Sequence, residues 1–114
     1  MSKSVSEINE KSSISELQKY VKEVNIKRGF SDETPQEKML LMVEEIGELA
    51  KASRKQSGIK IDSSKNNFSK IEHEMADILS YLLDLANKLN IDLFTAFREK
   101  EVENSKRVWD SAKR

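Results

Sequence analysis

Hydrophobic residues recur along most of the chain at the three-to-four-residue spacing of amphipathic helices, and not at the alternating spacing of strands. The first 12 residues are polar and lack this pattern, which predicts a flexible tail over residues 1–12 and one helical domain over residues 13–114. Ser13 and Glu16 match a capping box, in which two side chains satisfy free backbone N–H groups. The first helix is therefore predicted over residues 14–28.

A second helix start is marked by Thr34 and Pro35, an N-cap hydroxyl followed by proline at the first helical position. This helix is predicted to end at about Gln56. The remaining pattern predicts a polar connection over residues 58–67, a third helix over 68–89, a turn at 90–92 and a fourth helix over 93–111. Four helices with short connections predict an all-α four-helix bundle.

The second predicted helix is apolar on two sides. Its main stripe consists of Met39, Met42, Val43, Ile46, Leu49 and Ala50, whereas Leu41 and Ala52 fall nearly opposite. A helix of this kind usually lies between two layers. We therefore expect one side to face the chain's own bundle and the other a second subunit, in a homodimer or homotetramer.

Composition removes several classes of function. The 20 basic and 20 acidic residues balance, which argues against a nucleic-acid-binding protein. The absence of cysteine excludes a disulfide scaffold, a Cys-ligated metal and a thiol nucleophile, and a single histidine argues against His-rich metal sites. The chain contains no run of roughly 18 apolar residues and no signal-peptide pattern. These features predict a cytoplasmic protein with no membrane partner.

Acidic side chains gather at helical spacing in the second and third predicted helices. Glu44, Glu45 and Glu48 lie on one arc of the second, and Glu74 and Asp77 form an i,i+3 pair in the third. If these helices pack antiparallel, the two sets converge, and their repulsion requires protons or a cation. Oxygen ligands alone indicate a hard ion, Mg²⁺ or Mn²⁺. The alternative is a set of solvated acids paired with nearby lysines.

Lys100, Asn104 and Arg107 follow one another at i, i+4 and i+7, which places them on one face of the fourth predicted helix. Two cations flanking an amide suit phosphate oxygens. The alternative is a solvated face that pairs with Glu101 and Glu103.

Together these motifs resemble the MazG-like all-α nucleotide pyrophosphohydrolases. EExxE is followed after 25 residues by ExxD, and then by KxxxNxxR and a tryptophan. The surrounding strings RGFSDETPQEKMLLMVEEIGELAKASRK and EMADILSYLLDLANKLNIDLFTAF also look like that family, so that the resemblance covers about residues 14–109.

The resemblance implies hydrolysis of nucleoside triphosphates between the α- and β-phosphates, giving a monophosphate and pyrophosphate. It implies four Mg²⁺ ligands, Glu45, Glu48, Glu74 and Asp77, with Glu44 binding through water or orienting the attacking water. Lys100, Asn104 and Arg107 are expected on the phosphates, and Tyr81 at the sugar or base. Mn²⁺ is a possible substitute for Mg²⁺.

Related families and a second class of function stay open at this point. Dimeric dUTPases and phosphoribosyl-ATP pyrophosphohydrolases carry similar acidic motifs, although this chain's strings look closer to the MazG-like branch. A non-catalytic helical dimerisation or adaptor module would use the same acids only as surface charge. The sequence does not identify the base, the sugar or the number of metal ions.

Overall fold

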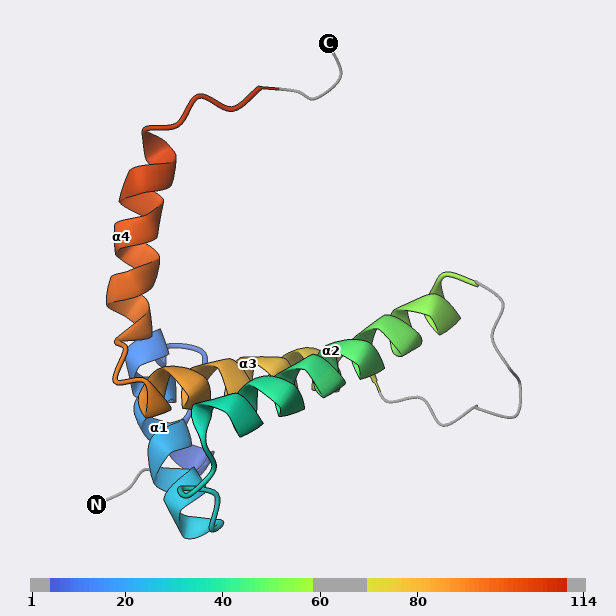
Figure 1. Cartoon of the computed structure of the whole chain (residues 1–114), viewed down its shortest axis with the longest axis vertical. Coiled ribbons are helices and arrows are strands. Elements are labelled where there is room, and N and C mark those ends of the chain that lie inside the picture. Colours follow the sequence, from blue (N-terminus) through green and yellow to red (C-terminus); the bar gives the residue numbers. More distant parts are fainter. Residues whose placement is uncertain (1–4, 59–69, 111–114) are drawn as a thin grey trace.

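The computed structural model describes residues 5–58 and 70–110, and this part of the chain is helical without strands. A short 3₁₀ turn, η1 (Val5–Glu7), precedes four α-helices: α1 (Ile14–Lys27), α2 (Pro35–Gln56), α3 (Ile71–Lys88) and α4 (Leu93–Ser105) (Figure 1). The predicted all-α class with four helices is confirmed. Apart from Gly58, the predicted connection over 58–67 lies outside the described residues, as does the predicted start of the third helix at residue 68.

The first two helices begin where their capping residues predict. The Ser13 hydroxyl accepts a hydrogen bond from the Glu16 backbone N–H at 3.0 Å, and the Glu16 carboxylate accepts one from the Ser13 N–H at 3.3 Å. At α2, the Thr34 hydroxyl accepts the Glu37 N–H at 3.1 Å, and Pro35 occupies the first turn. These bonds satisfy N–H groups that the helix itself leaves without an acceptor.

The turn between α3 and α4 also follows the prediction. Asn90 adopts a positive φ of 57°, and the Asp92 carboxylate caps α4 by accepting the Thr95 N–H at 3.1 Å. The end of α4 was predicted wrongly, because the helix stops at Ser105 and not at residue 111. The Trp109 indole N–H donates to the Asn104 carbonyl at 3.3 Å. This bond gives a donor to one of the last backbone carbonyls of the helix, which lack partners within it.

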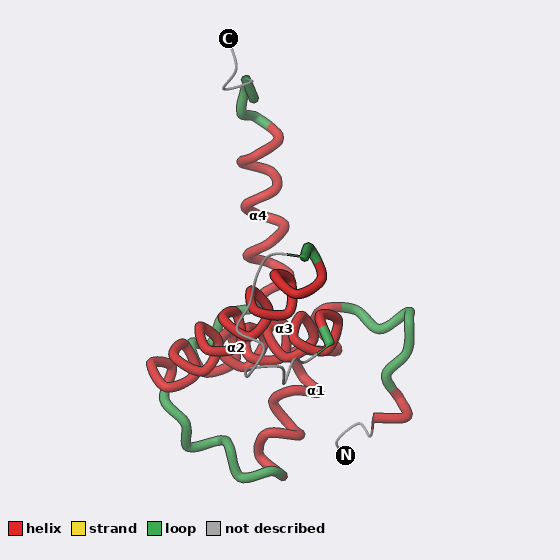
Figure 2. The backbone as a smooth tube through the Cα atoms, turned by 90° about the vertical axis from the view of Figure 1, so that its right-hand side faces the viewer, coloured by secondary structure: helices red, strands yellow, loops and turns green. Residues whose placement is uncertain are grey.

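Three of the helices pack together, and the fourth extends away from them. α2 and α3 lie side by side and antiparallel, α1 packs across α3, and α4 leaves the end of α3 and contacts α1 (Figures 1 and 2). The radius of gyration is 17.5 Å, whereas a compact domain of this length has about 13 Å. One chain therefore does not close a compact bundle. None of the described helices is long and apolar enough to cross a membrane.

The core of the single chain is small and contains charged groups. Its buried hydrophobic residues are Val21, Ala52, Leu83, Leu85 and Ala86, and its buried charged residues are Lys38, Glu74 and Asp84. The main stripe predicted for α2 is not buried within the chain, since Met39, Val43 and Ile46 are each about half exposed. α3 packs against the side of α2 that carries Lys38 and Ala52, and of the main stripe only Met42 and Leu49 are half-buried in the described part of the chain.

The Thr34 cap can be tested with two substitutions at one position. We expect Thr34→Ala to lower the free energy of unfolding by about 1 kcal/mol, because the Glu37 N–H loses its acceptor. Thr34→Ser keeps a hydroxyl and is expected to unfold like the wild type. Urea denaturation of the three proteins at one concentration measures both values. Equal losses in the two variants would contradict a capping role for the hydroxyl.

Candidate functional site

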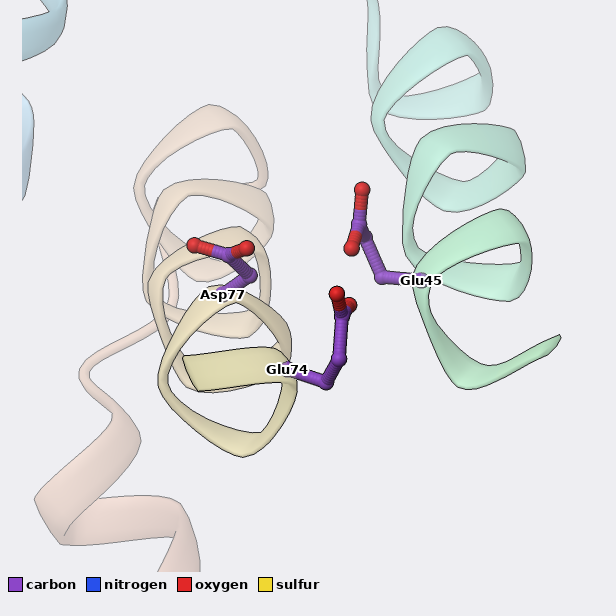
Figure 3. Close-up of side chains that lie close together, drawn as sticks. All are labelled: Glu45, Glu74 and Asp77. Carbon is purple, nitrogen blue, oxygen red and sulfur yellow. The ribbon is translucent and has the colours of Figure 1, made fainter. Parts of the chain in front are cut away.

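Three carboxylates converge where α2 and α3 face each other. Glu45 comes from α2, whereas Glu74 and Asp77 come from successive turns of α3, and one ligand oxygen from each lies within 4.8 Å of the others. Figure 3 shows the Glu45 and Glu74 side chains pointing into the space between the helices, with Asp77 beside them. The antiparallel packing of α2 and α3 thus unites acids that are 29 residues or more apart.

Burial and mutual repulsion change the acidity of this cluster. Glu74 is buried, Glu45 half-buried and Asp77 exposed. A hydrogen bond with Glu74 raises the pKa of Glu45 to about 7, aided by burial and by the charges of Glu74, Asp77 and Glu44. Near pH 7 the Glu45 carboxyl group is therefore about half protonated, and its proton lies in the hydrogen bond with Glu74. A divalent cation bound to all three carboxylates would neutralise the same repulsion, and the all-oxygen donor set fits a hard ion.

The other two acids of the predicted set lie outside this cluster. Glu44 is exposed, and its negative charge helps to raise the pKa of Glu45 in the cluster. Glu48, one turn after Glu45, is half-buried and is not among the three carboxylates that converge. Their predicted roles, water orientation for Glu44 and metal ligation for Glu48, stay predictions.

A pocket of about 420 Å³ adjoins the cluster and shares Asp77 with it. It lies between the end of α1, the loop that leads into α2, and the adjoining turns of α2 and α3. Its lining consists of Asn25, Arg28, Phe30, Glu33, Lys38, Leu41, Asp77, Ser80 and Tyr81. Two aromatic rings together with amide, hydroxyl and charged groups suit a ligand that has both a flat apolar ring and polar edges.

Tyr81, which was predicted to contact the sugar or base, lines this pocket. The pKa of its phenol is raised, chiefly by burial and then by the charge of Glu45, so the hydroxyl stays protonated at neutral pH. Sequence reasoning gave no role to Lys38, although it lies two helical turns before Glu45 and hence on the same face of α2. The sequence signal for such a role was a lysine on the same helix face as Glu45.

The predicted phosphate-binding residues lie on the extended part of the chain. Lys100 and Asn104 belong to α4, whereas Arg107 follows the helix end, so that the three do not share one helical face as predicted. Lys100 and Arg107 both pair with Glu103, at 3.5 and 3.4 Å, and the Asn104 amide donates to Glu101 at 3.3 Å. Within one chain, α4 points away from the α2–α3 pair that carries the carboxylates (Figures 1 and 2).

The sequence matches the MazG nucleotide pyrophosphohydrolase domain over residues 33–108, about two thirds of the chain. The matched region includes α2, α3 and α4, and therefore all three clustered carboxylates. This chain belongs to the MazG nucleotide pyrophosphohydrolase domain family. No curated protein matches the sequence significantly.

The proton on Glu45 predicts how stability depends on pH when a chelator removes divalent cations. The folded pKa of about 7 exceeds the ordinary 4.5, so the folded chain binds more protons than the unfolded chain between these values. This group therefore stabilises the fold fully below about pH 4.5, and the contribution is lost as pH rises through about 7. We expect the melting temperature to fall between about pH 5 and about pH 8, and to fall less in Glu45→Gln.

Glu72→Gln is the matched control for this measurement, because Glu72 is an exposed acid on the same face-to-face helix pair but outside the cluster. Its pH profile should follow the wild type. Parallel profiles for the wild type and Glu45→Gln would contradict a shared proton in the cluster.

Proposed function

We propose that this protein is a Mg²⁺-dependent nucleoside triphosphate pyrophosphohydrolase that removes unwanted nucleotides from the cytoplasmic pool. Water adds to the α-phosphorus, and the bond to the oxygen bridging the α- and β-phosphates breaks, which releases a nucleoside monophosphate and pyrophosphate. One observation carries the proposal: Glu45, Glu74 and Asp77 converge beside a pocket that shares Asp77. Membership of the MazG domain family supports the same reaction.

Glu45, Glu74 and Asp77 are proposed to hold the metal, with Glu48 as a fourth ligand after a change of side-chain rotamer. A bound Mg²⁺, or Mn²⁺ in its place, would neutralise phosphate charge and increase the acidity of a bound water. The fit rests on the donors themselves, three converging carboxylates in which a hydrogen bond with Glu74, burial and repulsion raise the pKa of Glu45 to about 7. Any proton on Glu45 must leave before this residue can act as a ligand.

The remaining residues of the site are proposed to position the substrate. The pocket between the α1–α2 loop and α3 takes the nucleoside, with Tyr81 as one wall and the phosphate chain directed toward Asp77. Glu44, which is exposed next to the cluster, is proposed to accept a hydrogen bond from the attacking water and so to orient it. Positioning of this kind supplies much of the rate enhancement when the reaction needs no covalent intermediate.

The apolar surface of the chain supports a homo-oligomer. Leu40, Val43, Met75 and Phe97 are all more than half exposed, at 71, 58, 58 and 66%, on α2, α3 and α4. A soluble monomer rarely leaves so many large apolar side chains uncovered. We propose that a second copy of the chain covers α2 and α3.

The same assembly offers a role for α4, which extends away from its own carboxylates. In an oligomer, Lys100, Asn104 and Arg107 can serve the site of a neighbouring copy. They are proposed to bind the phosphate oxygens that the metal leaves uncovered.

Pyrophosphate release from a panel of ribo- and deoxyribonucleoside triphosphates, with Mg²⁺ and with chelator, tests the reaction. We expect release only with the metal, with a stoichiometric amount of monophosphate. Glu45→Gln should lower the rate at least ~100-fold, because one metal-holding carboxylate is lost. Glu72→Gln, an exposed neighbour of the cluster, should stay within about two-fold of the wild type.

A folded wild-type protein that releases no pyrophosphate from any nucleotide, and whose melting temperature Mg²⁺ does not change, would overturn the proposal. That result would favour the non-catalytic adaptor, for which the acids are surface charge.

Light scattering coupled to size exclusion tests the oligomer. The wild type should elute with a mass two or four times 13.1 kDa. Leu40→Lys places a charge on the exposed apolar side of α2 and should shift the mass toward that of one chain. Ser53→Lys adds the same charge nearly opposite on the helix and should leave the mass unchanged. A wild-type mass of one chain would contradict the assembly.

A further inference from the structure

Lys38 is a buried cation that the proposed reaction does not use. Only 2% of the residue is exposed, yet its ammonium contacts groups from separate parts of the chain. The Nζ atom lies 3.0 Å from the Glu33 carboxylate, in the loop before α2, and 3.1 Å from the Asp84 carboxylate on α3. It also lies 4.7 Å from the ring centroid of Tyr81, within range of a cation–π contact.

A buried ion pair at this position is weak evidence for a purely stabilising role. Burying an ammonium ion costs several kcal/mol of solvation, and apolar residues of similar volume often replace buried ion pairs without loss of stability. Burial alone would lower the pKa of Lys38, but the hydrogen bonds and charges of Glu33 and Asp84 outweigh it and raise the pKa above 10.5. The ammonium is therefore charged at all physiological pH values.

The contacts of Lys38 connect the pocket wall to the packed helices α2 and α3. Lys38, Glu33 and Tyr81 all line the pocket, whereas Asp84 does not. Asp84 is itself buried and is held by a second cation, Lys88, at 3.4 Å. The ion pair with Asp84 thus fixes Lys38 to α3. Lys38 also contacts two residues of the pocket wall, Glu33 in the loop and Tyr81 on α3.

We propose that Lys38 is a positioning residue for nucleotide binding, because its ammonium holds the Tyr81 ring and the Glu33 loop in the arrangement that forms the pocket wall. This inference rests on the proposed function of the pocket. Lys38 is not among the residues proposed to hold the metal. Its loss should therefore weaken substrate binding without slowing the chemical step.

A double-mutant cycle between Lys38 and Tyr81 tests the inference in the full-length protein. Lys38→Met should raise KM for the best nucleotide at least five-fold and change kcat less than two-fold. In the Tyr81→Leu background the same substitution should raise KM by less than half of that factor, because the ring that Lys38 holds is gone. Equal factors in the two backgrounds, or a loss in kcat alone, would overturn the proposal.

Gln18→Leu is the control for general loosening of the fold. The Gln18 amide donates to the Ile91 carbonyl at 2.7 Å, and its oxygen accepts the Leu93 N–H at 3.1 Å, both outside the pocket. This variant should lose stability with an unchanged KM. If both variants raise KM in proportion to their loss in melting temperature, Lys38 has only a structural role.

Hydrogen exchange gives a result that does not depend on activity. Two of the backbone hydrogen bonds in the loop before α2 run from the Phe30 N–H to the Asn25 carbonyl at 2.8 Å and from the Glu33 N–H to the Phe30 carbonyl at 3.3 Å. Lys38→Met should accelerate exchange of these amides at least five-fold, and Gln18→Leu should not. If the wild type hydrolyses no nucleotide, the proposed function fails, and faster exchange still supports the positioning role. Unchanged exchange overturns it in either case.

Discussion

The repulsion among Glu45, Glu74 and Asp77 is the constraint on which the arrangement of this protein depends. Packing α2 against α3 buries apolar surface, but it also brings three carboxylates within 4.8 Å of one another. A proton or a cation reduces this repulsion, and the pKa of Glu45, raised to about 7, means that it binds a proton more readily than an ordinary glutamate. The same contact that forms the centre of the fold therefore creates the proposed metal site.

Local sequence signals predicted the elements well. The capping residues Ser13 and Thr34 stand at the helix starts that they predict, and Asp92 caps α4 after the turn at Asn90. Such signals work because each depends on a few neighbouring residues and on backbone groups that must find a partner. The end of α4 was missed, and there the Asn104 carbonyl accepts hydrogen bonds from the Trp109 indole and from the Arg107 backbone N–H. No periodicity reports a contact of that kind.

The candidate site was only partly predictable, for a related reason. Spacing on one helix places Glu74 and Asp77 on the same face, but it does not say which of Glu44, Glu45 and Glu48 meets them. The answer depends on how α2 turns about its axis when it packs on α3. The burial of Lys38 on α2 depends on the same packing, and hydrophobicity alone did not indicate it. A lysine that is neutralised by two carboxylates can be buried, and composition does not reveal its partners.

Asp77 belongs both to the carboxylate cluster and to the wall of the pocket, and this double membership has a thermodynamic consequence. A ligand that changes the electrostatic potential at Asp77 from the pocket side changes the free energy of cation binding on the other side. Linkage is reciprocal, so the cation must alter the affinity of the pocket by the same factor. A cation at the proposed metal site and a nucleotide in the pocket would therefore be energetically coupled through this one side chain, and each affinity would depend on the concentration of the other ligand.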